Sequence, residues 1–297
     1  MAWADLTDVR CYYETLGEGE PLLLIPGLGT TRRMWDSIVP DLACFFTVIL
    51  IDNRSVGLSV AKRQPNSTAD WAADIVELLD RLQLSRTHVL GVSLGGVIAQ
   101  RLAVDHPSRV DRLVLVSCAD CFSPYLRQMA GLLGHSLRHF PHELFVRTVE
   151  LLGTSPEYLD ANPQQVEQRV LAKCRSPVST KAIARQLRAL SCSEIDSRHY
   201  RITAPTLVIA GEHDAMIPSC YSRRMAERIP GSRFVVVPGA GHNPLVDVPE
   251  RVLPEVIEFL QANASKAGAS WIGSGGADAR STGSGQAVGG HRRFSFL

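Results

Sequence analysis

The sequence predicts an α/β fold in which helices cover both faces of a mostly parallel β-sheet. Short runs of apolar, often β-branched residues, typical of strands buried on both faces, alternate with segments whose apolar residues recur at helical spacing. The chain has 297 residues, of which 45% are hydrophobic, which suits one large domain with an insertion. No apolar run approaches the roughly 20 residues that cross a bilayer.

Charge and cysteine content narrow the functional class. Lys and Arg number 31 and Asp and Glu 30, so nothing in this balance indicates nucleic acid or an acidic membrane as a partner. The N-terminus lacks a basic stretch followed by an apolar core, so no secretion signal is expected. The seven cysteines are scattered and odd in number, which argues against a disulfide framework. We expect a cytoplasmic protein without membrane association or cofactor, whose oligomeric state the sequence leaves open.

Strands and helices are expected to alternate along the chain. Helical spacing occurs at 35–44, at 68–82, at 94–105 and at 249–261, and Thr68 is a suitable N-cap for the second of these helices. Because parallel strands end at the same edge of a sheet, ligand chemistry should gather at that edge. The strand-like runs lie at residues 9–16, 21–25, 46–51, 87–92, 112–116, 205–210 and 233–237.

Residues 118–201 interrupt this alternation. They contain no strand-like run and predict a helical cap over the ligand edge, inserted between two parts of the core at 1–117 and 202–262. Residues 263–297 are rich in Gly, Ser and Ala and are expected to form a flexible tail. Prolines separate the short amphipathic pieces of the insertion, at Pro124, Pro141, Pro156, Pro163 and Pro177.

A candidate nucleophile lies between the strand at 87–92 and the helix at 94–105. The segment reads Gly-Val-Ser-Leu-Gly at residues 91–95, with Ser93 at its centre, which is the G-x-S-x-G pattern of a nucleophile elbow. A serine on so tight a turn adopts a strained backbone, and its neighbours two residues away must lack side chains so that strand and helix can approach. The helix N-terminus then directs amides at the hydroxyl. The alternative is a small-residue turn that only packs a helix on a sheet.

A candidate base and acid follow later strands. A serine hydroxyl is a poor nucleophile unless a histidine takes its proton, and the histidine needs an acid to orient it. In this architecture the acid comes first and the histidine second, each after a strand. Asp214 follows the strand at 205–210 and His242 follows the strand at 233–237, so we assign them as acid and base.

Other residues compete for these roles. Asp120 follows the strand at 112–116 and is the alternative acid, and His213 adjoins Asp214 but does not follow the final strand. Asp52 also ends a strand, and with Arg54 beside it we interpret it as half of an ion pair that holds the turn.

An oxyanion formed at Ser93 would need two backbone donors. One should be the N–H of Leu94, directly after the nucleophile. The other should be the N–H of Leu28, in the Gly-Leu-Gly turn at 27–29 after the first parallel strand. Alternatively, the two glycines could be needed only for the backbone conformation of the turn.

One further spacing resembles that of a zinc site. It comprises Cys118, Cys121, His135 and His139. Against it, Cys118 directly continues a buried strand, so we expect core cysteines, surface histidines and no metal. A redox pair of the two cysteines is disfavoured for the same reason.

Three segments carry a resemblance to a known family. They are the turn that begins at Gly27, the Asp-Asn-Arg-Ser-Val-Gly-Leu-Ser turn at 52–59, and the elbow at 91–96. Over about residues 9–262 the chain resembles the α/β-hydrolase superfamily, and these segments are most similar to the 3-oxoadipate enol-lactonases and related esterases. Pro26 and Ser55 depart from the family pattern, where His and Gly are usual, but both leave the triad intact.

The sequence therefore predicts a serine hydrolase that cleaves a carboxylic ester or lactone of a small organic molecule. Ser93, His242 and Asp214 would act through an acyl-enzyme, with Leu28 and Leu94 as oxyanion donors. A carbon–carbon bond hydrolase with the same triad, or a non-catalytic homologue that binds a small ligand, are the alternatives. The resemblance does not predict the substrate, because specificity depends on the insertion.

Overall fold

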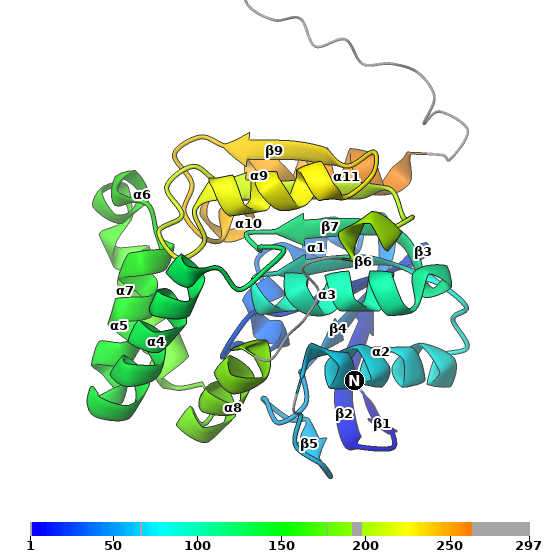
Figure 1. Cartoon of the computed structure of the whole chain (residues 1–297), viewed down its shortest axis with the longest axis horizontal. Helices are drawn as coiled ribbons and strands as arrows, with labels where there is room; N and C mark the ends of the chain where they lie inside the picture. The colour runs from blue at the N-terminus through cyan, green and yellow to red at the C-terminus, as the bar shows by residue number, and fades with distance from the viewer. Residues whose placement is uncertain (1, 66, 177, 192–197, 263–297) are drawn as a thin grey trace, which may run out of the picture. The chain divides into compact units, whose positions relative to one another are not determined.

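A single sheet of nine strands organises the described part of the chain, which in this computed structural model is residues 2–65, 67–176, 178–191 and 198–262 (Figure 1). The strand order is β1-β2-β4-β3-β6-β7-β8-β9, with β5 paired to β2. The six strands from β4 to β9 in this order run parallel, and β1, β2 and β5 are antiparallel to their neighbours. The predicted α/β fold is confirmed. The strands are β1 (Ala2–Asp5), β2 (Val9–Leu16), β3 (Glu20–Ile25), β4 (Phe46–Ile51), β5 (Val60–Ala61), β6 (Thr87–Val92), β7 (Val110–Val116), β8 (Thr206–Gly211) and β9 (Arg233–Val237).

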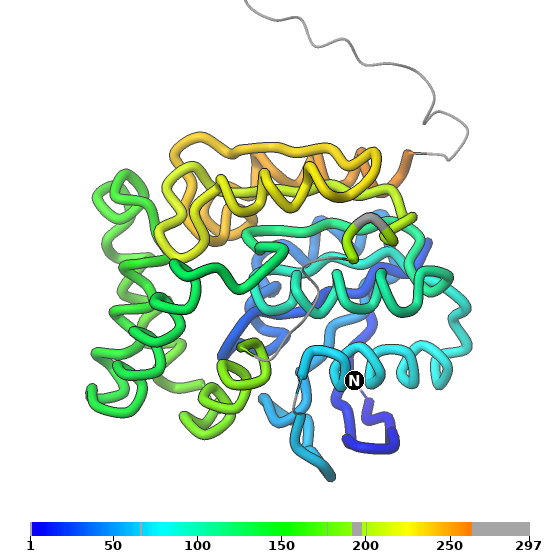
Figure 2. The backbone as a smooth tube through the Cα atoms, viewed as in Figure 1, coloured from blue at the N-terminus to red at the C-terminus, as the bar shows by residue number. Residues whose placement is uncertain are grey.

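Helices cover both faces of the sheet (Figures 1 and 2). Leu23 and Ile25 of β3 pack into the cluster that includes α2, α3 and α9, whereas Leu22 and Leu24 pack into the cluster that includes α1 and α11. Burial on both faces explains why the parallel strands read as continuous apolar runs instead of alternating with polar residues. These helices are α1 (Val39–Leu42), α2 (Thr68–Arg81), α3 (Leu94–Asp105), α9 (Ser219–Arg228) and α11 (Pro249–Gln261). The further segments η1 (Arg32–Trp35), η2 (Pro107–Arg109) and α10 (Pro244–Asp247) have three or four residues each.

Ser67 caps helix α2, so the predicted cap at Thr68 is wrong by one residue. The Asp70 carboxylate accepts the Ser67 N–H at 3.1 Å, and the Ser67 side chain accepts the Asp70 amide in return. Serine and threonine both suit an N-cap, and the carboxylate three residues onward selects Ser67.

Residues 118–201, which we call the cap segment, contain only helices in their described part (Figure 1, green). Pro124, Pro156 and Pro163 begin their helices, where a missing N–H costs nothing, and Pro141 is the N-cap of α5. Pro177 and residues 263–297 lie outside the described residues. The helices are α4 (Pro124–His139), α5 (His142–Gly153), α6 (Pro156–Ala161), α7 (Pro163–Cys174), α8 (Thr180–Ser191) and η3 (His199–Arg201).

The cap segment has an apolar cluster of its own, which also contacts the core. Val56, in the turn after β4, is buried in this cluster, and Leu28 packs against it. No helix among the described residues is long and apolar enough to cross a membrane. The cluster's buried residues from the cap segment are Leu137, Phe145, Val146, Val170, Val178, Ala182, Ile183 and Leu187.

Helix α3 approaches the sheet with no room for a side chain between them. A Cβ on Gly95 would lie 2.0 Å from the Ile25 carbonyl oxygen, and a Cβ on Gly91 would lie 2.3 Å from the Gly95 carbonyl oxygen. Both contacts are with backbone, which cannot rotate away as a flexible side chain can. The two glycines of the elbow are therefore required by packing between β3, β6 and α3.

Gly95→Ala should destabilise the protein by about 3 kcal/mol or more, because the new methyl group overlaps backbone atoms. The measurement is urea unfolding followed by circular dichroism. Gly131→Ala is the matched control, since Gly131 is exposed in α4 with no atom within 4 Å of the added Cβ. It should stabilise the protein by about 0.5–1 kcal/mol. Equal effects of the two substitutions would contradict this account of the elbow.

Candidate active site

Ser93 occupies the turn between β6 and α3 in a strained backbone conformation. Its φ is 55° and its ψ is −118°, a region that residues with a Cβ rarely adopt. Two hydrogen bonds hold the turn: the Ser93 N–H donates to the Val116 carbonyl at 2.9 Å, and the Val97 N–H donates to the Ser93 carbonyl at 3.1 Å. The residue lines a cavity of about 1090 Å³ at the carboxyl edge of the sheet.

His242 and Asp214 are hydrogen-bonded to each other. His242 Nδ1 lies 2.7 Å from Asp214 Oδ2, and the other carboxylate oxygen accepts the N–H groups of Met216 and Ile217, each at 2.9 Å. The Asp214 side chain is fully buried. Because an ionised carboxylate can only accept, Nδ1 carries the proton and Nε2 is the nitrogen available for other contacts. His242 lines the same cavity as Ser93.

The backbone of His242 is held by the cap segment. Its N–H donates to the Gly153 carbonyl oxygen at 2.7 Å, at the end of α5. A Cβ on Gly241 would lie 2.4 Å from the same oxygen, so the loop after β9 and the end of α5 pack backbone to backbone. The sequence analysis missed Gly153, because a contact made by a backbone carbonyl leaves no side-chain signature.

The two expected oxyanion donors both line the cavity. Leu28 follows β3 in a turn, and Leu94 is the first residue of α3. In the described residues no carbonyl or side chain accepts a hydrogen bond from either backbone amide. A Cβ placed on Gly27 would lie 3.6 Å from the Ser93 Cβ, so the turn and the serine are adjacent. Two backbone amides without an acceptor among the described residues thus belong to residues that line the same cavity as Ser93.

Asp120 has other partners. One carboxylate oxygen lies 3.0 Å from Arg224 and the other 2.6 Å from Arg228, and the side chain is fully buried. Asp120 therefore anchors helix α9, and it is Asp214, not Asp120, that contacts His242.

The predicted Asp52–Arg54 ion pair is wrong. Asp52 lies 3.2 Å from Arg32 and accepts the Arg32 and Leu58 amides, whereas Arg54 forms its close, buried ion pair with Asp74. The two residues follow the same strand, but Asp52 faces the loop after β3 and Arg54 faces α2. Neighbours along a turn need not face each other.

The cysteines and histidines with zinc-like spacing do not form a cluster of metal ligands in the described residues. Cys118 is buried and its sulfur accepts a hydrogen bond from Gln100 at 3.5 Å. Burial raises the pKa of the Cys118 thiol well above its ordinary value, which opposes both metal binding and redox chemistry. His135 and His139 instead contact each other on α4, with ring centroids 4.3 Å apart.

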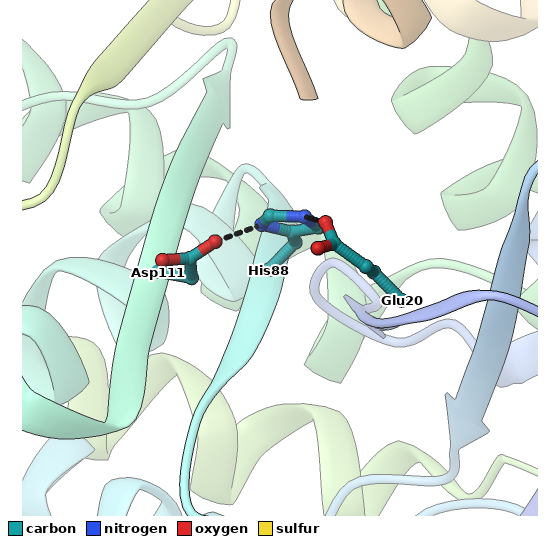
Figure 3. Close-up of side chains that lie close together, drawn as sticks. All are labelled: Glu20, His88 and Asp111. Carbon is teal, nitrogen blue, oxygen red and sulfur yellow. Dashed lines mark hydrogen bonds and ion pairs between the residues drawn. The ribbon is translucent and has the colours of Figure 1, made fainter. Parts of the chain in front are cut away.

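A different group of possible ligands lies at the opposite edge of the sheet (Figure 3). His88 Nε2 lies 2.9 Å from Glu20, and Nδ1 lies 3.2 Å from Asp111, which also pairs with Arg86. Burial lowers the pKa of the His88 imidazole. Both ring nitrogens face carboxylates, and Asp111 already has a cationic partner. We therefore interpret this group as structural: its ion pairs hold together the first residues of β3, β6 and β7.

Charged side chains from the cap segment line the cavity near His242, and they neutralise one another. Arg169 lies 2.9 Å from Glu150 and 2.8 Å from Asp247, and Lys173 lies 2.5 Å from Glu150. Glu150 and Asp247 are buried. This network joins α5 and α7 to α10, and it leaves little free charge at this end of the cavity.

Comparison with known proteins identifies the family. Residues 20–249 match the model of the alpha/beta hydrolase fold. The chain belongs to this family and is a hydrolase. The predicted resemblance to the α/β-hydrolase superfamily is thereby confirmed.

Three relatives illustrate the similarity. RutD of Caulobacter sp. strain K31, which is named for carbamate hydrolysis, is 30% identical over 259 residues, covering 86% of this chain and 97% of that protein. The pimeloyl-[acyl-carrier protein] methyl ester esterase of Aeromonas hydrophila is 29% identical, covering 83% and 97%. The enol-lactonase of Burkholderia xenovorans LB400 has a TM-score of 0.79 at 23% identity, covering 88% and 100%, and shows the shared fold.

Asp214→Asn should lower kcat by about 10⁴-fold, because an amide beside Nδ1 favours the wrong imidazole tautomer. Asp120→Asn should leave kcat within about threefold while lowering the midpoint of thermal unfolding, since it weakens a buried ion pair. Turnover of p-nitrophenyl acetate and a thermal melt of each variant make the comparison. A large loss of kcat in Asp120→Asn alone would reverse the assignment of the acid.

Proposed function

We propose that this hydrolase cleaves a carboxylic ester or lactone of a small organic molecule, with Ser93 as nucleophile, His242 as base and Asp214 as the acid that orients it. One observation carries the proposal: a strained serine and a histidine bonded to a buried carboxylate line the same cavity. These three residues come from loops after β6, β8 and β9, which end at one edge of the sheet.

The reaction proceeds in two half-reactions. His242 Nε2 takes the proton of Ser93 Oγ as the oxygen attacks the substrate carbonyl, and the imidazolium then gives the proton to the leaving alkoxide. An acyl-enzyme on Ser93 remains. Water, deprotonated by the same nitrogen, attacks the ester carbon and releases the acid, and the proton returns to Ser93. Asp214 keeps Nδ1 protonated and stabilises the imidazolium.

The backbone amides of Leu28 and Leu94 stabilise the oxyanion that forms in each half-reaction. Leu94 is the first residue of α3, so its N–H belongs to the unpaired amides at a helix N-terminus and carries the positive end of the helix dipole. Fixed donors of this kind stabilise developing charge without reorganising at the moment of reaction.

The part of the cavity beside Arg169 favours an uncharged group of the substrate. Apolar side chains of α4, α5 and α8 supply much of its wall, and the charges of Arg169, Lys173, Glu150 and Asp247 compensate one another. A charged group placed against this network would lose hydration without gaining a free partner. The exposed Arg33 and Arg175 also line the cavity, outside this network. The named reactions of the relatives, at a carbamate and at a methyl ester, both begin at a carbonyl carbon, which supports acyl chemistry here.

The cysteines support a cytoplasmic location. The six in the described part of the chain are free thiols, and Cys44 and Cys220 are exposed. Exposed free thiols persist best in a reducing compartment.

A fluorophosphonate probe should label the wild-type protein at Ser93, because the probe reacts only with a serine activated by a base. Labelling and turnover of a panel of short-chain esters, lactones and a carbamate should both disappear in Ser93→Ala. Mass spectrometry of the labelled peptide identifies the site. Folded wild-type protein that neither reacts nor turns over the panel would favour the non-catalytic binding homologue.

The enzyme should prefer neutral esters over anionic ones of equal length. We expect kcat/KM for the methyl ester of a straight-chain monocarboxylic acid to exceed that for the monomethyl ester of the corresponding dicarboxylic acid by tenfold or more, since each 1.4 kcal/mol of uncompensated desolvation is a factor of ten. Titration of the released acid measures both rates. A preference for the half-ester would contradict this prediction and would show that a cation of the cavity wall, such as Arg33, Arg169 or Arg175, pairs with the substrate carboxylate.

A further inference from the structure

The turn that carries Leu28 is held by a side chain from the cap segment. Gln186, in α8, is 1% exposed, and its Oε1 accepts the Gly29 N–H at 2.8 Å. The two residues are 157 positions apart in the chain. Because Gly29 offers a donor, the amide atom that faces it must be the oxygen.

This hydrogen bond acts on the peptide unit next to the proposed oxyanion donor. The Thr30 N–H bonds to the Gly27 carbonyl at 3.4 Å, and Gly29 has a φ of 65°, as at the third position of a type II turn. In such a turn the peptide between Leu28 and Gly29 can flip by a half-turn, which changes ψ of Leu28 and turns the Gly29 N–H away from Gln186. Gln186 binds the N–H of that peptide and therefore holds one of its two orientations.

Two further contacts also hold the turn in place. The Gly27 N–H donates to Met34 Sδ at 3.4 Å, so the amides on both sides of Leu28 are bound while that of Leu28 is left to the cavity. Ile183, one turn before Gln186 in α8, lies 3.2 Å from the position of a Cβ on Gly29. The helix thus contacts the turn through packing and through a directed hydrogen bond.

The interaction carries a cost in stability. Among the described residues, Gln186 Nε2 is buried without a hydrogen-bond partner. An apolar residue at this position would avoid that cost but would leave the Gly29 N–H unpaired. Stability alone therefore does not explain a glutamine at this position. The orientation that its oxygen imposes on the turn does.

We infer that Gln186 is a positioning residue for hydrolysis, which orients the Leu28 amide toward the oxyanion from the cap segment. The inference rests on the proposed function. Gln186 is not among the residues that line the cavity, so it acts through the turn and does not touch the substrate.

The test compares Gln186→Met, which removes the acceptor at similar size, with Gln186→Glu, which keeps an oxygen at that position. Active sites are counted by fluorophosphonate burst titration, so a misfolded fraction does not enter kcat. We expect Gln186→Met to lower kcat per active site tenfold or more with KM changed less than threefold, since a lost oxyanion donor costs about 10²–10³. Gln186→Glu should recover most of that loss.

A second readout separates positioning from a structural role. A trifluoromethyl ketone, which binds serine hydrolases as an oxyanion adduct, should lose affinity in Gln186→Met by the same factor as kcat. Arg185→Met, exposed on the same helix, is the control and should match the wild type in both measurements.

The outcomes are distinct. If the wild type hydrolyses esters and Gln186→Met retains kcat within twofold per active site, the inference is overturned while the proposed function stands. If the wild type is not labelled by the fluorophosphonate and does not hydrolyse esters, both the inference and the proposed function are overturned. Equal loss in Gln186→Met and Gln186→Glu would also overturn the inference, because it would assign the effect to packing.

Discussion

The close approach of α3 to β3 and β6 is the constraint on which the site depends. With a glycine at 95, the helix N-terminus lies against the Ile25 carbonyl, and with a glycine at 91 the strand can turn directly into the helix. Ser93 takes the positive φ that this turn demands. The same geometry brings the end of β3, and hence the Leu28 turn, next to the serine. A backbone contact thus sets both the strained conformation of Ser93 and the position of its neighbours.

The cap segment takes part in the site through backbone hydrogen bonds as well as by lining the cavity. The His242 N–H binds the Gly153 carbonyl, and the Gly29 N–H binds Gln186. Both contacts join a loop at the carboxyl edge of the sheet to a cap helix. The ion network around Arg169 adds a third connection, through Asp247 of α10. Under the proposed function, we therefore expect substitutions within the cap segment to change reaction rate as well as substrate preference.

Two histidines show how surroundings decide the role of an imidazole. In the part of the chain that the structure describes, His242 has a carboxylate at Nδ1 and none at Nε2, and it borders a cavity. His88 faces a carboxylate at each ring nitrogen and is buried at the other edge of the sheet (Figure 3). Under the proposed function, His242 Nε2 exchanges a proton with Ser93, whereas both ring nitrogens of His88 face a carboxylate. Residue type alone does not distinguish them, whereas position relative to the strand ends does.

The sequence by itself determined seven of the nine strands, the long helices α2, α3 and α11, and the candidate residues Ser93, Asp214 and His242. It did not predict β1 or β5, and the helix expected at 35–44 is only the short α1 preceded by η1. The correct predictions rest on local signals, because a period of two or 3.6 residues, a glycine pair around a serine or a polar residue after a strand can be read within a short window. Only the tertiary structure decided that Asp52 pairs with Arg32, and that Gly153 and Gln186 hold the loops of the site. Those contacts join segments far apart in the chain, often through backbone atoms common to every residue, so no local pattern encodes them.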